Sequence, residues 1–254
     1  MKHPIMADFE LQVVGLFRRS DPTAELVRRD GLARRADVVS LAFHRHQRGA
    51  FDGCRLDPLS PHSEAAARQI VVVKYPWEPQ HLAMTRDFIF RNTFADIERI
   101  LKDLGEGCGT RFEFECYDVG HLYNLAHFLD RGMVNPPLFV QTIFGILGGI
   151  GADPENLVHM KRIADKLFGD SYAWSILAAG RHQLPLVSMG AIMGGNVRVG
   201  LEDSLWIGRG KLARSNADQV SAIRAIVENL SLEIASPDEA RAMLALKGGD
   251  AVAF

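Results

Sequence analysis

The clearest alternation of apolar and polar positions in the chain lies at residues 196–204. Read as part of a strand over residues 196–207, the alternation separates two faces. The apolar face carries Val197, Val199 and Leu201, and the polar face carries Arg198, Gly200 and Glu202. This pattern is typical of a barrel strand covered outside by helices. Glu202 and Asp203 then lie at the strand's C-terminal end, where such barrels keep their chemistry.

Strand and helix periodicities alternate along the C-terminal two-thirds of the chain. Apolar runs predict strands at residues 111–117, 138–146, 173–179 and 196–207. Helical spacing predicts helices at residues 121–131, 153–168, 184–193 and 216–230, and Ser236-Pro-Asp-Glu caps one more. Such repetition indicates a parallel sheet. The expected fold is therefore α/β, a TIM (β/α)8-type barrel, formed as one domain over residues 1–254.

The first third of the chain is harder to interpret. Strands are predicted at residues 9–17, 37–43 and 70–75, with a helix at 21–35. Residues 49–63 are rich in Gly, Pro, Arg and His and show little periodicity. Three strands before residue 100 and four after it are one fewer than a closed eight-stranded barrel requires. We therefore expect N-terminal strands that are incomplete or aberrant.

Composition narrows the function classes. The 254 residues suit one barrel, and 47% apolar with 24% charged residues is ordinary for a soluble domain. A net charge of −2 favours neither a nucleic-acid nor a membrane partner. The three cysteines form no CxxC pair, and the N-terminus has acidic residues without the apolar core of a secretory signal. We expect a cytoplasmic protein.

Two glutamates on the 111–117 strand are candidates for chemistry. Glu113 and Glu115 share a face with Tyr117, whereas the phenylalanines between them occupy the other face. On an edge strand the glutamates would face water; inside a barrel they would face the lumen. A carboxylate there needs a partner or a place near the open end. We expect Glu115 to be functional and Glu113 to be a buried partner of an arginine.

Arg198 and Asp203 allow more than one role. Arg198 could bend upward to a carboxylate at the barrel mouth, or form a structural ion pair with Glu113 or Glu115. Asp203 either points to the opposite face or begins the following loop, where it could be a cap or turn residue. Arg181 follows another predicted strand and is placed either to meet an anionic substrate or to lie on the surface.

His44 and His46 follow the apolar run at residues 38–43. Histidines two apart at a strand end point to the same side, and two histidines with one glutamate form a catalytic zinc set. The alternative is that His-Arg-His-Gln-Arg is a solvated basic loop. The glycine pairs at 148–149 and 194–195 match neither dinucleotide-binding nor phosphate-binding loops.

Several motifs together resemble one family. They are Arg111-Phe-Glu-Phe-Glu-Cys-Tyr-Asp118, Gly145-Ile-Leu-Gly-Gly149, Ala179-Gly-Arg181, Gly195-Asn-Val-Arg-Val-Gly-Leu-Glu-Asp203 and Ser215-Asn-Ala-Asp-Gln-Val220. In this order they resemble the β-keto acid cleavage enzymes, the family of 3-keto-5-aminohexanoate cleavage enzyme. The likeness runs from about Tyr75 to the C-terminus, and residues 1–74 match poorly.

The resemblance implies a zinc-dependent TIM barrel that condenses a β-keto acid with acetyl-CoA and releases acetoacetate and a new CoA thioester. It implies Zn²⁺ held by Glu202 and by a His-x-His at a strand end, for which His44 and His46 are the candidates. It makes Asp203 and Arg198 the catalytic pair, with Asp203 as base, and puts Glu115 in the substrate site. It also implies a homo-oligomer, a tetramer.

The front of the chain departs from the family pattern, since a Thr-Thr-Gly-Gly-like strand end and an Asn- and Gly-rich one are missing. In one register, residues 37–46 are the second strand and supply the zinc histidines. In the other, residues 21–39 are the second helix and third strand, the zinc histidines are absent, and residues 40–70 are unrelated sequence, as from a reading-frame error. A truncated, non-catalytic barrel and another metal-dependent lyase or aldolase are the alternative functions.

Overall fold

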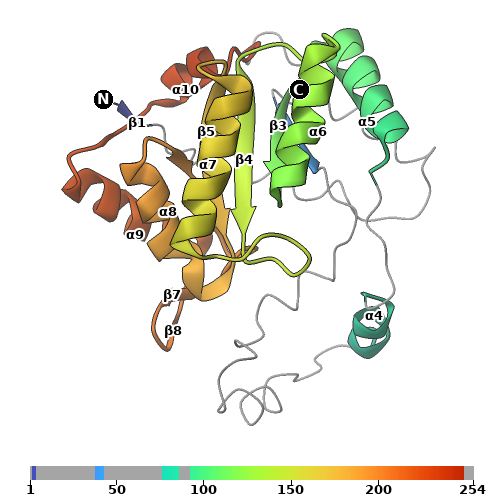
Figure 1. Cartoon of the computed structure of the whole chain (residues 1–254). Helices are drawn as coiled ribbons and strands as arrows, with labels where there is room; N and C mark the ends of the chain where they lie inside the picture. Colours follow the sequence, from blue (N-terminus) through green and yellow to red (C-terminus); the bar gives the residue numbers. More distant parts are fainter. Residues whose placement is uncertain (1, 4–37, 43–75, 86–91, 249–254) are drawn as a thin grey trace.

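The computed structural model describes residues 2–3, 38–42, 76–85 and 92–248. Helices and strands alternate over most of this part (Figure 1). The strands are β1 (Lys2–His3), β2 (Val38–Ala42), β3 (Arg111–Cys116), β4 (Leu138–Phe144), β5 (Tyr172–Ala178), β6 (Asn196–Val197), β7 (Trp206–Gly208), β8 (Lys211–Leu212) and β9 (Glu233–Ile234). The helices are α4 (Glu78–Thr85), α5 (Phe94–Ile100), the π-helical η3 (Leu101–Glu106), α6 (Val119–Asp130), α7 (Pro154–Phe168), the short 3₁₀ helix η4 (Gly180–His182), α8 (Gln183–Ile192), α9 (Asn216–Asn229) and α10 (Pro237–Met243).

The main sheet has the order β2-β3-β4-β5-β6, and each neighbouring pair is parallel. Strands thus follow one another in chain order, as in the wall of a (β/α) barrel. In register, Ala42 of β2 pairs with Glu115 of β3, and Glu115 pairs with Gln141 of β4. All carboxyl ends therefore meet at one edge, the lower one in Figure 1.

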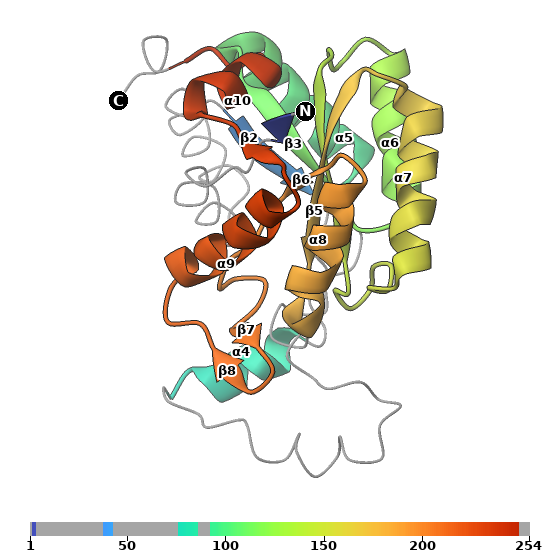
Figure 2. The same ribbon diagram turned by 90° about the vertical axis from the view of Figure 1, so that its left-hand side faces the viewer.

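The two faces of the sheet differ in chemistry. Phe112, Phe114 and Cys116 belong to a large apolar core with residues of α6, α7 and α8, which lie along this face (Figure 2). On the opposite face Tyr117 packs with Ile143 and Leu177 in a small separate cluster. The prediction that the phenylalanine face of the 111–117 strand meets the helices is confirmed. The glutamates of β3 therefore point to the inner face.

Most predicted elements of the C-terminal two-thirds are present, with ends shifted by a few residues, and the predicted 37–43 strand is β2. The strand predicted over residues 196–207 is wrong in extent, because β6 ends at Val197 and a turn follows at residues 201–203. The amides of Asp203 and Ser204 both donate to the Gly200 carbonyl, which closes the turn. Predictions for residues 9–17, 21–35 and 70–75 lie outside the described residues.

Gly195 lets the connection between α8 and β6 pass close to β5. A Cβ built there would lie 2.3 Å from Cδ1 of Ile176 and 2.8 Å from Cε3 of Trp174. Both side chains are buried, so neither can move without disturbing the core. We expect Gly195→Ala to lower the free energy of unfolding by about 1–3 kcal/mol in urea titrations.

Gly120 in the first turn of α6 offers the matched control, because a Cβ there meets nothing within 4 Å. Gly120→Ala should leave stability unchanged or raise it slightly. Equal destabilisation by both substitutions would contradict the packing explanation.

Within the described residues, no helix combines the length and apolar character needed to cross a membrane.

Candidate active site

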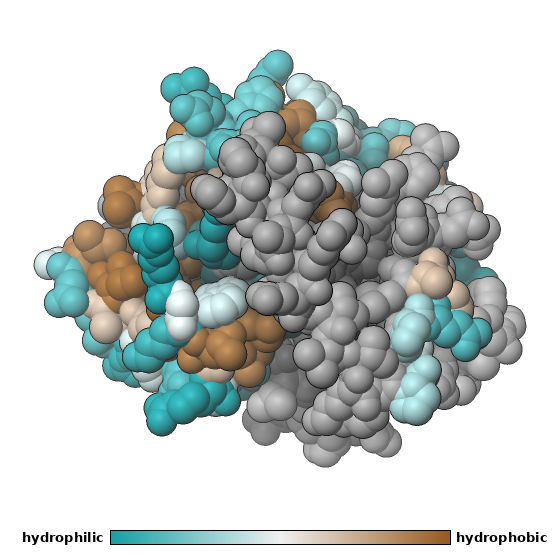
Figure 3. All heavy atoms as spheres, turned by 90° about the horizontal axis from the view of Figure 1, so that it is seen from below, coloured by the Kyte–Doolittle hydropathy of each residue, from teal (hydrophilic) through white to brown (hydrophobic). Residues whose placement is uncertain are grey.

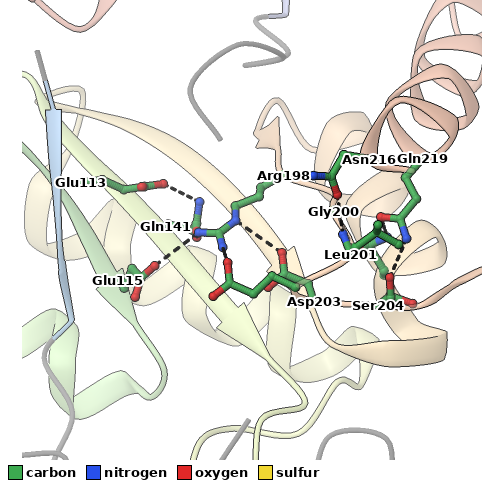
Figure 4. Close-up of polar contacts among 12 residues, drawn as sticks. Glu113, Glu115, Gln141, Arg198, Gly200, Leu201, Asp203, Ser204, Asn216 and Gln219 are labelled. Atoms are coloured by element: carbon green, nitrogen blue, oxygen red, sulfur yellow. Dashed lines mark hydrogen bonds and ion pairs between the residues drawn. The ribbon is translucent and has the colours of Figure 1, made fainter. Parts of the chain in front are cut away.

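Arg198, directly after β6, is the centre of the polar cluster on the inner face (Figure 4). Its amide donates to the Ile176 carbonyl at 3.0 Å, so the backbone continues the β5 pairing by one residue. The guanidinium then reaches across the inner face toward β3 and β4 and also toward the following turn. One side chain therefore connects three strands and the carboxyl-end turn.

Glu115 and Gln141 meet Arg198 from the neighbouring strands. Arg198 Nη1 lies 3.4 Å from Glu115 Oε1 and donates to Gln141 Oε1 at 3.2 Å. The Tyr117 hydroxyl donates to the other Glu115 oxygen at 3.0 Å, which fixes the carboxylate in place. Of the two alternatives, the structural ion pair of Arg198 with a β3 glutamate is present, and the partner is Glu115.

The expectation for Glu113 needs correction. Gln141 lies between Glu113 and Arg198, accepting a hydrogen bond from the arginine and donating one to Glu113. Glu113 is one pleat deeper than Glu115, so the guanidinium reaches the nearer carboxylate and the amide bridges to the farther one. Gln141 is a site residue that the sequence reasoning missed, although an amide within a mostly apolar strand is a recognisable signal.

Glu202 and Asp203 meet Arg198 from the turn. Arg198 Nη2 donates to Glu202 Oε2 at 2.9 Å, and Nε lies 3.3 Å from Asp203 Oδ2. Arg198 thus does bend to the mouth, while it also binds Glu115. Asp203 begins the loop, as one alternative held, and its side chain points to Arg198 (Figure 4). The Glu202 side chain is 49% exposed, but that of Asp203 only 8%.

The cluster carries surplus negative charge. Three carboxylates contact one guanidinium, which leaves a formal charge of 1 − 3 = −2. Burial alone would lower the pKa of Arg198, but Asp203, Glu113, Glu115 and Glu202 raise it well above its ordinary value. Burial also raises the pKa of Glu113 to about 7; Glu115 and Asp203 add to this shift, whereas Arg198 and the Gln141 hydrogen bond oppose it. A divalent cation or a proton would be stabilised here.

The raised pKa of Glu113 predicts a pH-dependent stability. A carboxyl whose pKa is higher in the folded than in the unfolded protein stabilises fully below its ordinary pKa, and this contribution is lost as pH rises through about 7. Glu113→Gln keeps an acceptor for Gln141 and removes the ionisation. We expect the variant to gain up to about 3 kcal/mol over the wild type between pH 5 and 8, measured by urea unfolding. A stability difference that is independent of pH would contradict the assignment.

The proposed histidine ligands, His44 and His46, lie outside the described residues, two and four positions after the last residue of β2. Within the described part, no group of three or more His, Cys, Asp or Glu side chains could hold a metal ion. Glu202 is available as one ligand: Oε2 binds Arg198, and Oε1 has no hydrogen-bond partner among the described residues. The described residues can therefore supply one metal ligand, the Glu202 carboxylate.

The mouth has further polar and apolar features. Arg181, at the carboxyl end of β5, is exposed and donates from Nε to His182 Nε2 at 3.2 Å, so contact with an anionic substrate stays a prediction. Viewed from the carboxyl ends of the strands, the described surface mixes hydrophilic and apolar side chains (Figure 3). The β7–β8 hairpin carries exposed Trp206 and Leu212.

Comparisons with solved structures bear on the fold. The apo structure of ObcA matches with a TM-score of 0.57 and 16% sequence identity, covering 82% of this chain and 44% of that one. ObcA with oxaloacetate matches with a TM-score of 0.53 and 17% identity, covering 82% of this chain and 45% of that chain. At this identity the likeness concerns fold alone, and it confirms the expected α/β fold of the TIM-barrel type.

Sequence comparisons bear on the family. A relative from Paraburkholderia graminis, "3,5-dioxohexanoate:acetyl-CoA acetone transferase", is 65% identical over 176 residues, 69% of this chain and 56% of the relative. The "3-keto-5-aminohexanoate cleavage enzyme" of Fusobacterium nucleatum is 34% identical over 161 residues, 63% of this chain and 57% of the relative. The chain spans about half the length of the curated relatives it matches. The beta-keto acid cleavage enzyme family profile matches residues 31–246, and the chain belongs to that family.

Proposed function

We propose that this chain catalyses acetyl-CoA-dependent cleavage of a β-keto acid, giving acetoacetate and a new CoA thioester. The observation that carries the proposal is the convergence of Asp203, Glu202 and Glu115 on Arg198 at the carboxyl ends of the strands. These residues lie in the motifs that resemble the family. The carboxylates meet at Arg198, although 83 positions separate Glu115 from this arginine.

The first substrate to test is 3,5-dioxohexanoate, since the printed name of the 65% identical relative includes it. For a β-keto acid R–CO–CH₂–COO⁻, the balanced reaction with acetyl-CoA gives R–CO–SCoA and acetoacetate. For 3,5-dioxohexanoate, R is CH₃–CO–CH₂, so the thioester would be acetoacetyl-CoA. The relatives differ in the substrates that their names state, so R is the group that the variable part of the site must recognise.

Asp203 is the proposed base. The proton to be removed is on C2 of the substrate, which lies between the keto group and the carboxylate and is the acidic position. The resulting carbanion attacks the acetyl carbonyl and displaces CoA thiolate, which then attacks the original keto carbon. Cleavage of the C2–C3 bond releases the new thioester, and the acetoacetate carbanion takes back the proton. Burial of Asp203 keeps water from competing for this carboxylate.

Arg198 is the proposed partner of the base. Nε faces Asp203, while Nη1 and Nη2 bind Glu115, Gln141 and Glu202. With all three nitrogens engaged, the guanidinium is suited to orient Asp203 and balance its charge. Glu115, held by Tyr117 and Arg198, is proposed to line the substrate site.

Zinc is the proposed metal, with Glu202, His44 and His46 as ligands. Two histidines and one carboxylate leave a coordination position open for substrate, and the formal surplus of −2 around Arg198 favours a divalent cation. When bound, zinc supplies a Lewis acid that polarises a keto oxygen.

The tetramer implied by the family resemblance remains a proposal, to be checked by light scattering.

Metal analysis tests the zinc proposal independently of activity. We expect about one zinc per chain in the wild type and loss of most of it in Glu202→Ala, His44→Ala and His46→Ala. Glu228→Ala is the matched control, because Glu228 is also half-exposed and also paired with an arginine four positions away, at 2.9 Å. Full zinc content in Glu202→Ala would contradict the ligand assignment.

Activity assays separate the alternative functions. Product formation without acetyl-CoA would favour an aldolase, and no turnover with any β-keto acid would favour a non-catalytic barrel.

A further inference from the structure

We propose that the buried side-chain amides of Gln183 and Gln219 are positioning residues that hold the carboxylate-bearing turn at residues 200–204 against Arg198. The inference rests on the proposed function, since it assigns these amides to the orientation of Asp203. It gives a role to the Ser215-Asn-Ala-Asp-Gln-Val220 motif, which the proposed chemistry leaves unused.

The two amides form a continuous chain of hydrogen bonds. Gln219 Nε2 donates to the Ser204 carbonyl, and Gln219 Oε1 accepts from Gln183 Nε2 at 3.0 Å. Gln183 Oε1 then accepts from the Gly200 amide at 3.1 Å. The two glutamines thus bind the turn at its first and last residues, Gly200 and Ser204, which flank Glu202 and Asp203.

Helix α9 supplies another contact to the same turn. Asn216 Oδ1 accepts from the Leu201 amide at 2.8 Å (Figure 4). The helix start itself is fixed by Ser215, whose hydroxyl accepts from the Asp218 amide at 3.2 Å. Asn216 and Gln219 are three apart, so both point from one side of the first helical turn toward residues 200–204.

Burial makes this arrangement stiff. Gln183 is 1% exposed and Gln219 is 0% exposed, so water cannot replace a lost bond without entering the core. Each amide uses its donor and its acceptor within the chain, which leaves little freedom for an alternative rotamer. The turn that carries Asp203 is therefore held from two helices in addition to its own hydrogen bonds to the Gly200 carbonyl.

A purely structural role would also explain two buried, hydrogen-bonded amides. The test must therefore distinguish a structural role from a positioning role. Gln219→Met nearly conserves volume and removes both hydrogen bonds. We expect it to lower kcat/KM by about 10- to 100-fold, mostly through kcat, because small displacements of a catalytic group have effects of this order. In an Asp203→Asn background the same substitution should lower kcat/KM less than twofold, because the group it positions is already lost.

Thr142→Val is the matched control, as Thr142 is buried and hydrogen-bonded to Trp174 and Ser175 outside the polar cluster. It should have the same effect in both backgrounds. Gln183→Met should reproduce Gln219→Met, and the double variant should be no worse than either, since both break one chain. Equal fold-losses for Gln219→Met in both backgrounds would overturn the positioning role.

Thermal unfolding keeps the inference testable if the chain proves inactive. Asp203 reaches Arg198 only while the turn is held, so the fall in Tm caused by Gln219→Met should be smaller in the Asp203→Asn background than in the wild type. Additive Tm changes would overturn the inference. Absence of cleavage activity, or full activity of Asp203→Asn, would instead reject the proposed function.

Discussion

Asp203→Asn is expected to lower kcat/KM for acetyl-CoA-dependent cleavage by about 10²- to 10⁴-fold, the range for loss of a general base. The asparagine oxygen can still face Arg198 Nε, and the Asp203 backbone bonds to Gly180 and Gly200 are unaffected by the change of side chain. The variant therefore keeps the shape of the turn and loses only the capacity to take a proton.

Steady-state kinetics with varied keto acid at saturating acetyl-CoA would measure this effect. Asp103→Asn is the control, since Asp103 of η3 is exposed, paired with Arg99 at 3.4 Å and away from the cluster. It should stay within about twofold of the wild type, as expected for an exposed pair. Activity of Asp203→Asn within the same range would show that another group takes the proton.

Arg198→Met should have the largest effect on stability as well as abolishing activity. Removing the guanidinium leaves Glu115 and Asp203 as partly or largely buried carboxylates without their cation, and Glu202 without its partner. Breaking a buried pair in this way lowers the free energy of unfolding by about 3–5 kcal/mol. For a chain of this size the corresponding fall in Tm is about 10 °C or more.

The pH dependence gives this prediction a specific signature. Arg198 opposes the rise in the pKa of Glu113, which burial brings to about 7. Removing the guanidinium should raise this pKa further, so the deficit of Arg198→Met should shrink as pH falls from 8 to 5 and Glu113 takes up a proton. Arg224→Met removes an exposed arginine bound to Glu228 and should change stability by less than about 1 kcal/mol at either pH. A small, pH-independent deficit for Arg198→Met would show that the carboxylates do not depend on this charge.

The two faces of the sheet could be predicted from sequence because strand periodicity leaves no choice. Once residues 111–117 are a strand, Phe112 and Phe114 must oppose Glu113 and Glu115, and only one set suits a helix-covered core. The same logic placed Arg198 opposite Val197 and on the glutamate face. These predictions depend on neighbours one or two positions away.

The turn after β6 could not be predicted in this way. Alternation continues in the sequence through Leu201 and Glu202, yet the backbone turns at Gly200 because amides from α8 and α9 bind it there. Gln183 is 17 positions from Gly200, and Gln219 is 15 positions from Ser204. The apolar and polar pattern of neighbouring residues therefore cannot predict these two hydrogen bonds. In a continuous strand, Glu202 and Asp203 would lie on opposite faces. The turn instead brings both carboxylates to the guanidinium of Arg198.

The most direct test of the proposed reaction follows the acetyl carbons. The chain would be incubated with [¹³C₂]acetyl-CoA and unlabelled 3,5-dioxohexanoate, with other β-keto acids in parallel, and the products analysed by mass spectrometry. The account predicts acetoacetate heavier by two mass units, with both ¹³C atoms in its acetyl half, together with an unlabelled acetoacetyl-CoA. Both products should form about 10²- to 10⁴-fold more slowly in Asp203→Asn. Unlabelled acetoacetate, or cleavage that proceeds without acetyl-CoA, would contradict it.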